Sequence, residues 1–113
     1  MTSKRDTPVI QSNGEITNPT TNVMADTGRL RSGFYEVLVV ASASAAAEFV
    51  IQRRSVGSLS TVGSGIIFYA PASQAVAVPA RFEVGENENI RVMMNANLTG
   101  DAVATITAQR IED

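Results

Sequence analysis

The sequence contains no cysteine and no histidine among its 113 residues, and each absence removes a class of chemistry. Without cysteine there is no disulfide bond and no thiolate to hold a metal or attack a substrate. Without histidine the chain lacks the commonest general base, the commonest metal ligand and the usual group that titrates near neutral pH. A hydrolase or metalloenzyme is therefore a poor interpretation, and we expect a protein that is not an enzyme and uses no cofactor.

Aromatic side chains are scarce as well: there is no tryptophan, and the chain holds four phenylalanines and two tyrosines. Sugar-binding platforms and single-stranded nucleic-acid grooves both normally use exposed rings. The net charge of −2 also disfavours a nucleic-acid binder, which needs concentrated basic charge. We therefore expect no nucleic-acid partner, and we rank carbohydrate recognition through Tyr35 or Tyr69 below recognition of another protein.

Long apolar runs are missing too. No run is longer than the one from Val37 to Ala41, which is far too short to cross a bilayer, so we expect no membrane partner. The first six residues open with charges and have no apolar segment behind them, which is not the pattern of a signal peptide. The sequence thus predicts a protein that is made in the cytoplasm of its producing cell and is kept or assembled there.

What the chain does have is 44% hydrophobic residues, with alanine and valine prominent among them. A chain of this length forms one domain and buries enough surface for one core without covalent cross-links. Because the apolar side chains are mostly small, we expect that core to be thin and closely packed.

Residues 1–32 differ from the rest of the chain, since they are polar and carry apolar residues only in short pieces. Asn13-Gly14 is a tight-turn signal, and Val9-Ile10 and Ile16 on either side of it could form a small hairpin. This segment cannot bury a core alone, so we predict an extended N-terminal arm that is either disordered or docked on a neighbour. The residues predicted to bind the partner are the apolar ones: Val9, Ile10, Ile16, Val23, Met24 and Leu30.

From Gly33 onward the sequence predicts six short strands with turn residues between them. The predicted strands are residues 34–43, 47–54, 66–70, 76–84, 90–96 and 102–111. No segment has helical periodicity, and the even spacing of turns is typical of a sandwich or a barrel. We therefore predict an all-β fold, in which residues 33–113 form a two-sheet antiparallel β-sandwich of jelly-roll type.

Two of these strands have informative patterns. The strand from Phe34 to Ala43 is apolar at both alternating sets of positions, so either both of its faces are covered or one face is an interface. The strand from Val76 to Val84 alternates strictly, and Pro79 within it cannot donate a backbone hydrogen bond. That strand is therefore expected at a sheet edge or at a bulge.

Two clusters admit a functional interpretation but favour a structural one. Glu83, Glu86 and Glu88 lie near one turn, where they could bind calcium or act as an acid–base pair. A solvated hairpin turn, in which the charges also prevent edge pairing, is the simpler interpretation. The glycine- and serine-rich segment from Gly57 to Gly65 has no lysine to contact a phosphate and precedes a strand rather than a helix. We interpret it as a connector or a contact loop.

Four further residues form a possible interface. Eight of the nine basic residues are arginine, which suits planar contacts between proteins. Arg53, Arg54 and Arg91, with Arg81 as a further candidate, could contact a partner or could pair with outward glutamates. Met93 points away from the predicted core beside Arg91, which suits an adaptable contact surface but also an ordinary exposed methionine.

The pattern resembles the small decoration, or cement, proteins of tailed-phage heads. The likeness lies in the size, the polar arm and four segments: residues 33–37, 47–54, 82–92 and 99–111. It implies a dimer or trimer on the outer surface of the virion, bound across joints between subunits of the major capsid protein. The same pattern resembles receptor- or carbohydrate-binding jelly rolls of phage fibres and similar surface assemblies, which is the alternative function.

Overall fold

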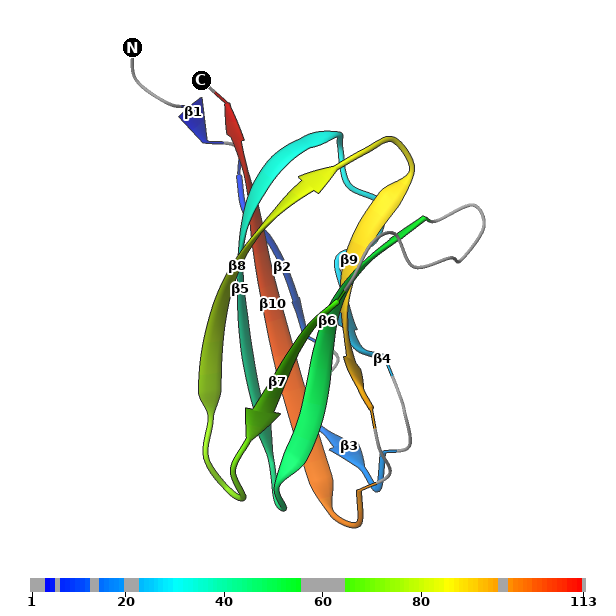
Figure 1. Ribbon diagram of the computed structural model, residues 1–113, viewed down its shortest axis with the longest axis vertical. Helices are drawn as coiled ribbons and strands as arrows, with labels where there is room; N and C mark the ends of the chain where they lie inside the picture. Colours follow the sequence, from blue (N-terminus) through cyan, green and yellow to red (C-terminus); the bar gives the residue numbers. More distant parts are fainter. Residues whose placement is uncertain are drawn as a thin grey trace.

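The computed structural model describes residues 4–5, 7–12, 15–19, 23–55, 65–95 and 98–112, all of them in strands, turns or extended connections. The strands form two antiparallel sheets that pack face to face (Figure 1). The predicted all-β sandwich, jelly-roll-like in form, is confirmed. In the described part of the chain no helix has the length and apolarity needed to cross a membrane.

The larger sheet has six strands and is centred on the longest one, β10 (Figure 1). On one side of β10 lie β5 and then β8, while β1, β2 and β3 follow one another along its other side. The bounds are β1 Lys4–Arg5, β2 Val9–Ser12, β3 Ile16–Thr17, β5 Gly33–Ala43, β8 Val76–Val84 and β10 Asp101–Glu112.

The smaller sheet has four strands in the order β4-β9-β6-β7. Their bounds are β4 Val23–Asp26, β6 Ala47–Ser55, β7 Ile66–Ala70 and β9 Glu88–Met94. All six strands predicted after residue 33 are therefore present, and Pro79 lies in β8, an edge strand as expected. Ala96, at the end of a predicted strand, and residues 57–64 of the predicted loop lie outside the described residues.

Alternating side chains from both sheets form the core. The inward positions of β10 are Ala102, Ala104, Ile106 and Ala108, all buried. The three alanines leave room for the larger side chains of the opposite sheet, where the rings of Phe49 and Phe68 stack with centroids 5.4 Å apart. Close packing of small against large side chains is what the alanine- and valine-rich composition allows.

The N-terminal segment is not a separate arm in the part that the structure describes. β1, β2 and β3 pair with β10, and β4 is a strand of the smaller sheet. The Asn18 side chain accepts a hydrogen bond from the Gly100 amide (2.8 Å), which fixes this segment at the start of β10. Residue 32 is thus no boundary in the packing, because backbone pairing with long strands supplies what the short apolar pieces lack.

The small hairpin that Val9-Ile10 and Ile16 could form is not found in the described part of the chain. β2 pairs with residues 105–108 of β10 and β3 pairs with residues 101–102, so both strands follow the same edge of β10 instead of pairing with each other. The expected turn residues, Asn13 and Gly14, lie outside the described residues. An available edge on a long strand competes successfully with a short local pairing.

Candidate binding face on the six-stranded sheet

The surface of the six-stranded sheet that points away from the core is unusually apolar. On β5 the outward residues Phe34, Leu38 and Val40 are 62%, 43% and 39% exposed, and Ile10 on β2 is 68% exposed. A solvated face of an antiparallel sheet normally carries polar residues. Clustered exposed apolar side chains mark interaction sites. We call this surface the outer face; it comprises Ile10, Phe34, Glu36, Leu38, Val40, Ala77, Pro79, Arg81, Glu83, Thr105, Thr107, Gln109 and Ile111.

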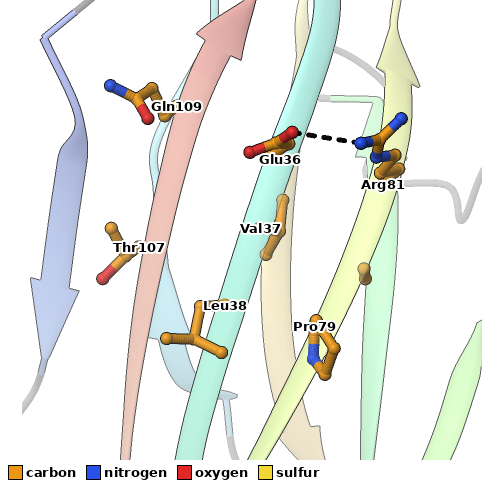
Figure 2. Close-up of a pocket in the computed structure, with 8 residues that line it drawn as sticks. Glu36, Val37, Leu38, Pro79, Arg81, Thr107 and Gln109 are labelled. Atoms are coloured by element: carbon orange, nitrogen blue, oxygen red, sulfur yellow. Dashed lines mark hydrogen bonds and ion pairs between the residues drawn. The ribbon is translucent and has the colours of Figure 1, made fainter.

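A row of three polar residues crosses the outer face. Strand register places Gln109 of β10 opposite Glu36 of β5, and Glu36 opposite Arg81 of β8. Arg81 Nη2 donates to Glu36 Oε1 at 3.2 Å (Figure 2). An exposed pair of this kind stabilises a fold by only about 0–1 kcal/mol. Its charged groups can therefore exchange partners with a ligand at small cost.

On both sides of the polar row lie rows that contain apolar residues. On one side Leu38 lies between Thr107 and Pro79, with Ile10 next to Thr107. On the other side, Phe34 pairs with Ile111 and with Glu83. The apolar residues of the outer face thus lie beside hydrogen-bonding groups in neighbouring rows.

Two open hollows lie along these rows. One, of about 480 Å³, is lined on the outer face by Glu36, Leu38, Pro79, Arg81, Thr107 and Gln109 (Figure 2). The other, of about 470 Å³, is lined by Phe34, Tyr35, Arg81 and Ile111. Arg81 lines both hollows, one with Glu36 and Gln109 and the other with Phe34. Each volume is in the range of small-molecule sites.

The N-terminal residues predicted to bind a partner fall into two groups. Val9 and Ile10 are exposed, and Ile16 and Val23 are half-buried. Met24 and Leu30, in contrast, belong to the core, and Met24 is fully buried. Those two residues hold the sandwich together and are not available to a partner, because β4 points Met24 inward and a backbone bond from Leu30 to the Glu88 carbonyl (2.9 Å) anchors Leu30.

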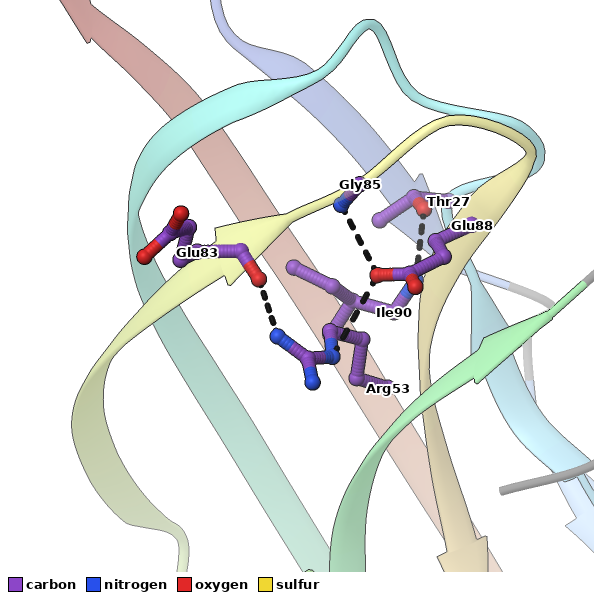
Figure 3. A network of polar contacts seen from close by, with 6 residues as sticks. All are labelled: Thr27, Arg53, Glu83, Gly85, Glu88 and Ile90. Carbon is purple, nitrogen blue, oxygen red and sulfur yellow. Dashed lines mark hydrogen bonds and ion pairs between the residues drawn. The ribbon is translucent and has the colours of Figure 1, made fainter. Parts of the chain in front are cut away.

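Of the four residues predicted as an interface, Arg53 has a different position from the others. It follows Phe49 and Ile51 on the inward side of β6, at one end of the sandwich. There it pairs with Glu88 (3.3 Å) and donates to the backbone carbonyl of Glu83 on β8 (Figure 3). Arg53 therefore connects the two sheets.

The same network accounts for Glu88. Its carboxylate also accepts a hydrogen bond from the Gly85 amide (2.8 Å), which closes the turn (Figure 3). Among the described residues, no group of three or more acidic side chains lies close enough to hold a metal ion. The Glu88 carboxylate thus has a structural role, while Glu83 and Glu86 are exposed.

Arg54, Arg91 and Met93 lie on the outward side of the smaller sheet, opposite to the inward Ile90, Val92 and Met94. Arg91 Nε donates to the Gln52 side chain at 3.2 Å. Partial burial, with the charge of Arg54 nearby, lowers the pKa of the Arg91 guanidinium. These residues therefore share a face that is separate from the outer face defined above.

The two tyrosines have contrasting positions, and neither lies on the outer face. Tyr35 is buried, and its hydroxyl donates to the Arg31 carbonyl (2.6 Å). Tyr69 is exposed on β7 and hydrogen-bonds with Glu48. The aromatic ring that the outer face does expose is Phe34. The strand that is apolar on both faces was the signal for it, since Tyr35 and Phe34 must point to opposite sides.

Fold and face together define a jelly-roll-like β-sandwich with a mixed polar and apolar sheet surface. No family model matches the chain, and no curated protein matches it in sequence. Similar solved structures include the C-terminal family 22 carbohydrate-binding module of xylanase 10B from Clostridium thermocellum. That likeness has a TM-score of 0.63 at 11% identity and covers 97% of this chain and 85% of the module.

Two other solved structures are similar. One holds the CBM22-1–GH10 modules of the same Clostridium thermocellum xylanase complexed with xylohexaose, with a TM-score of 0.62, 12% identity and 91% of this chain covered. This chain spans only 24% of that protein. The other is the globular domain of zebrafish complement 1qA, with a TM-score of 0.60, 10% identity and coverage of 88% and 94%. At such identities the likeness is one of fold.

Proposed function

We propose that this chain is a non-catalytic carbohydrate-binding module whose outer face binds a saccharide. The observation that carries the proposal is the exposed Phe34 ring next to the row formed by Gln109, Glu36 and Arg81. It is the alternative function that the sequence suggested, now with a different aromatic residue at its centre.

The chemistry of a pyranose ring suits this surface. One side of such a ring presents C–H groups, which pack on aromatic and aliphatic side chains such as Phe34 and Leu38. Its edge presents hydroxyls, which both donate and accept hydrogen bonds. Arg81 supplies donors, Glu36 supplies acceptors, and an amide such as Gln109 supplies both. Strand register places these groups side by side before a ligand arrives.

The similar solved structures support the proposal, but they are not its main evidence. Two of the solved structures hold carbohydrate-binding modules, and one of these was crystallised with xylohexaose. A fold hosts many functions, so the function follows from the residues of the site. Open, largely preformed hollows with a few convergent polar groups are the usual form of a small-ligand site.

The test is a glycan array followed by calorimetric titration with xylo-oligosaccharides and with any glycan that scores. We expect binding that Phe34→Ala and Arg81→Ala each weaken at least tenfold. Arg54→Ala, on the outward side of the other sheet, is the matched control and should leave the affinity unchanged. A broad array without a single hit would overturn the proposal.

A second candidate is the decoration of a capsid shell, and one observation favours it. Ile10 and Val40 extend the exposed aliphatic surface beyond the residues assigned to the sugar, and such surface suits burial against a protein. The partner would then be the major capsid protein on the outside of a virion. Co-sedimentation with bare phage heads tests this candidate, and Leu38→Asp should abolish it while Arg81→Ala weakens it little.

A further inference from the structure

The two sheets have four edges, and three of them carry features that block pairing with another chain. β8 presents Pro79 and two charged residues. The far edge of β10 is covered by the short strands β1, β2 and β3. β4 carries a register irregularity between Val23 and Ala25. Short strands, proline, charge and bulges are the recognised means of protecting a sheet edge.

The fourth edge, β7, has none of these features. β7 ends the smaller sheet, and no described strand pairs with its free side (Figure 1). Its sequence, Ile66-Ile67-Phe68-Tyr69-Ala70, holds no charge, no proline and no glycine. It pairs with β6 over all five residues without an irregularity. Ile67 and Tyr69 are 58% and 68% exposed. A regular, apolar, open edge of this kind is a site of strand addition.

We infer that β7 pairs antiparallel with β7 of a second copy of this chain, so that the two four-stranded sheets join into one continuous sheet. The strand is complementary to itself. A two-fold axis at Phe68 places Ile67 of one copy opposite Tyr69 of the other, and the same contact occurs a second time by symmetry. Pairs of aromatic and β-branched side chains are among the favourable cross-strand neighbours.

The distribution of charge on β7 and β6 also permits pairing with a second copy. β7 has no charged residue, so no like charges meet across the new pairing. The carboxylate closest in the sheet is Glu48 on β6, which bonds to Tyr69 of its own chain. In the joined sheet the two copies of Glu48 stand three strand spacings apart, or about 14 Å. That exceeds the Debye length of about 8 Å at physiological salt, so their repulsion is screened.

The first test is the mass in solution, by sedimentation or by light scattering after size exclusion. We expect a dimer at high protein concentration, with twice the 12.0 kDa chain mass. The double variant Ile67→Lys, Tyr69→Lys should be a folded monomer, because four lysines would meet at the pairing. Leu38→Lys places a charge on the outer face and should remain dimeric. A monomeric wild type, or a lysine variant that is still dimeric and folded, would overturn the inference.

A cross-linking test checks the register independently. The chain has no cysteine, so any disulfide comes from the introduced residues. Directly opposite residues in an antiparallel pair have Cα atoms about 4.5–5.5 Å apart, within disulfide range. We expect a mixture of the single variants Ile67→Cys and Tyr69→Cys to cross-link on mild oxidation. Either variant alone should not, since like positions lie about two residues out of register. Equal cross-linking in all three samples would contradict the pairing.

This inference does not depend on carbohydrate binding. β7 belongs to the smaller sheet and contributes no residue to the outer face. A chain that binds no glycan can still form the dimer, and a monomeric chain can still bind a glycan, so the two tests fail separately.

Discussion

Arg53 is the side chain that links the two sheets at one end of the sandwich. Its pair with Glu88 is largely shielded, with 26% and 15% of the two side chains exposed, whereas 81% of Arg81 is exposed in the pair with Glu36. Removing one partner of a shielded pair leaves the other charge poorly solvated, which costs more than losing an exposed pair. We expect Arg53→Ala to lower the free energy of unfolding by about 1–3 kcal/mol. Chemical denaturation measures this, with Arg81→Ala as the control that changes it by less than about 1 kcal/mol. Equal effects would contradict the linking role.

Glu48 is the residue whose titration reports on β7. A hydrogen bond from Tyr69, together with one from Asn95 (2.7 Å), lowers the pKa of the Glu48 carboxyl. The hydrogen bond to Glu48 and its charge raise the pKa of the Tyr69 hydroxyl. For Glu48 the folded pKa is depressed, so its contribution to stability is present above the unfolded pKa and is lost as pH falls through the folded value. The Tyr69 contribution is present below its unfolded pKa and is lost as pH rises through the folded one.

The matching experiment is a carboxyl NMR titration of the wild type and of Tyr69→Phe. We expect Glu48 to titrate below ordinary glutamates in the wild type and to move upward in the variant, because the strongest hydrogen bond to its charged form is gone. Asn95→Ala should move it upward as well, but less. A Glu48 pKa that does not respond to Tyr69→Phe would show that the hydroxyl does not bond to this carboxylate.

Among the strands of the N-terminal segment, β4 contributes most to the stability of the fold. Met24 and Ala25 are fully buried, and Asp26 links β4 to its surroundings through a bond from the Asn89 amide (2.6 Å). We expect Met24→Ala to destabilise the fold by about 2–5 kcal/mol, as for other large core residues. The exposed Ile10→Ala serves as the control and should cost less than about 0.5 kcal/mol. Thermal unfolding measures both. A mild effect at Met24 would restore the idea of a dispensable arm.

The sequence predicts some elements well and others poorly for a physical reason. Strands β5 to β10 are runs of five or more residues bounded by turn residues, and β8 and β10 also alternate between apolar and outward residues, so these strands can be recognised from the local sequence. β4 has only Val23, Met24 and Ala25 between polar neighbours, and its stability comes from pairing with β9, far away in the sequence. The sequence predicts the existence of the outer face but not the residues exposed on it. Because β5 is apolar at both alternating sets of positions, the sequence indicates that both faces of this strand are covered or that one of them is an interface. Only the packing shows that Phe34 is the exposed ring.

At the scale of the whole molecule, the proposed dimer has a consequence for how its outer faces point. A two-fold axis at Phe68 runs perpendicular to the joined sheet, because that is the symmetry of an antiparallel pair. Phe68 points into the core of its own sandwich, so both sandwich cores, and both six-stranded sheets, lie on the same side of the joined sheet. The two outer faces therefore point in the same direction, where one extended surface can contact both.

Such an arrangement converts modest affinity at one face into strong attachment at two. On an immobilised polymeric ligand, or on a capsid shell, the second contact is intramolecular and raises the apparent affinity by roughly 100-fold or more where the spacing fits. We expect the monomeric Ile67→Lys, Tyr69→Lys variant to bind a short soluble ligand as the wild type does, yet to dissociate much faster from a densely coated surface. Surface plasmon resonance at low and high ligand density separates the two effects. Because the lysines lie on the other sheet, a loss of affinity for the soluble ligand would mean that β7 takes part in binding itself, and equal dissociation at both densities would mean that the faces do not act together.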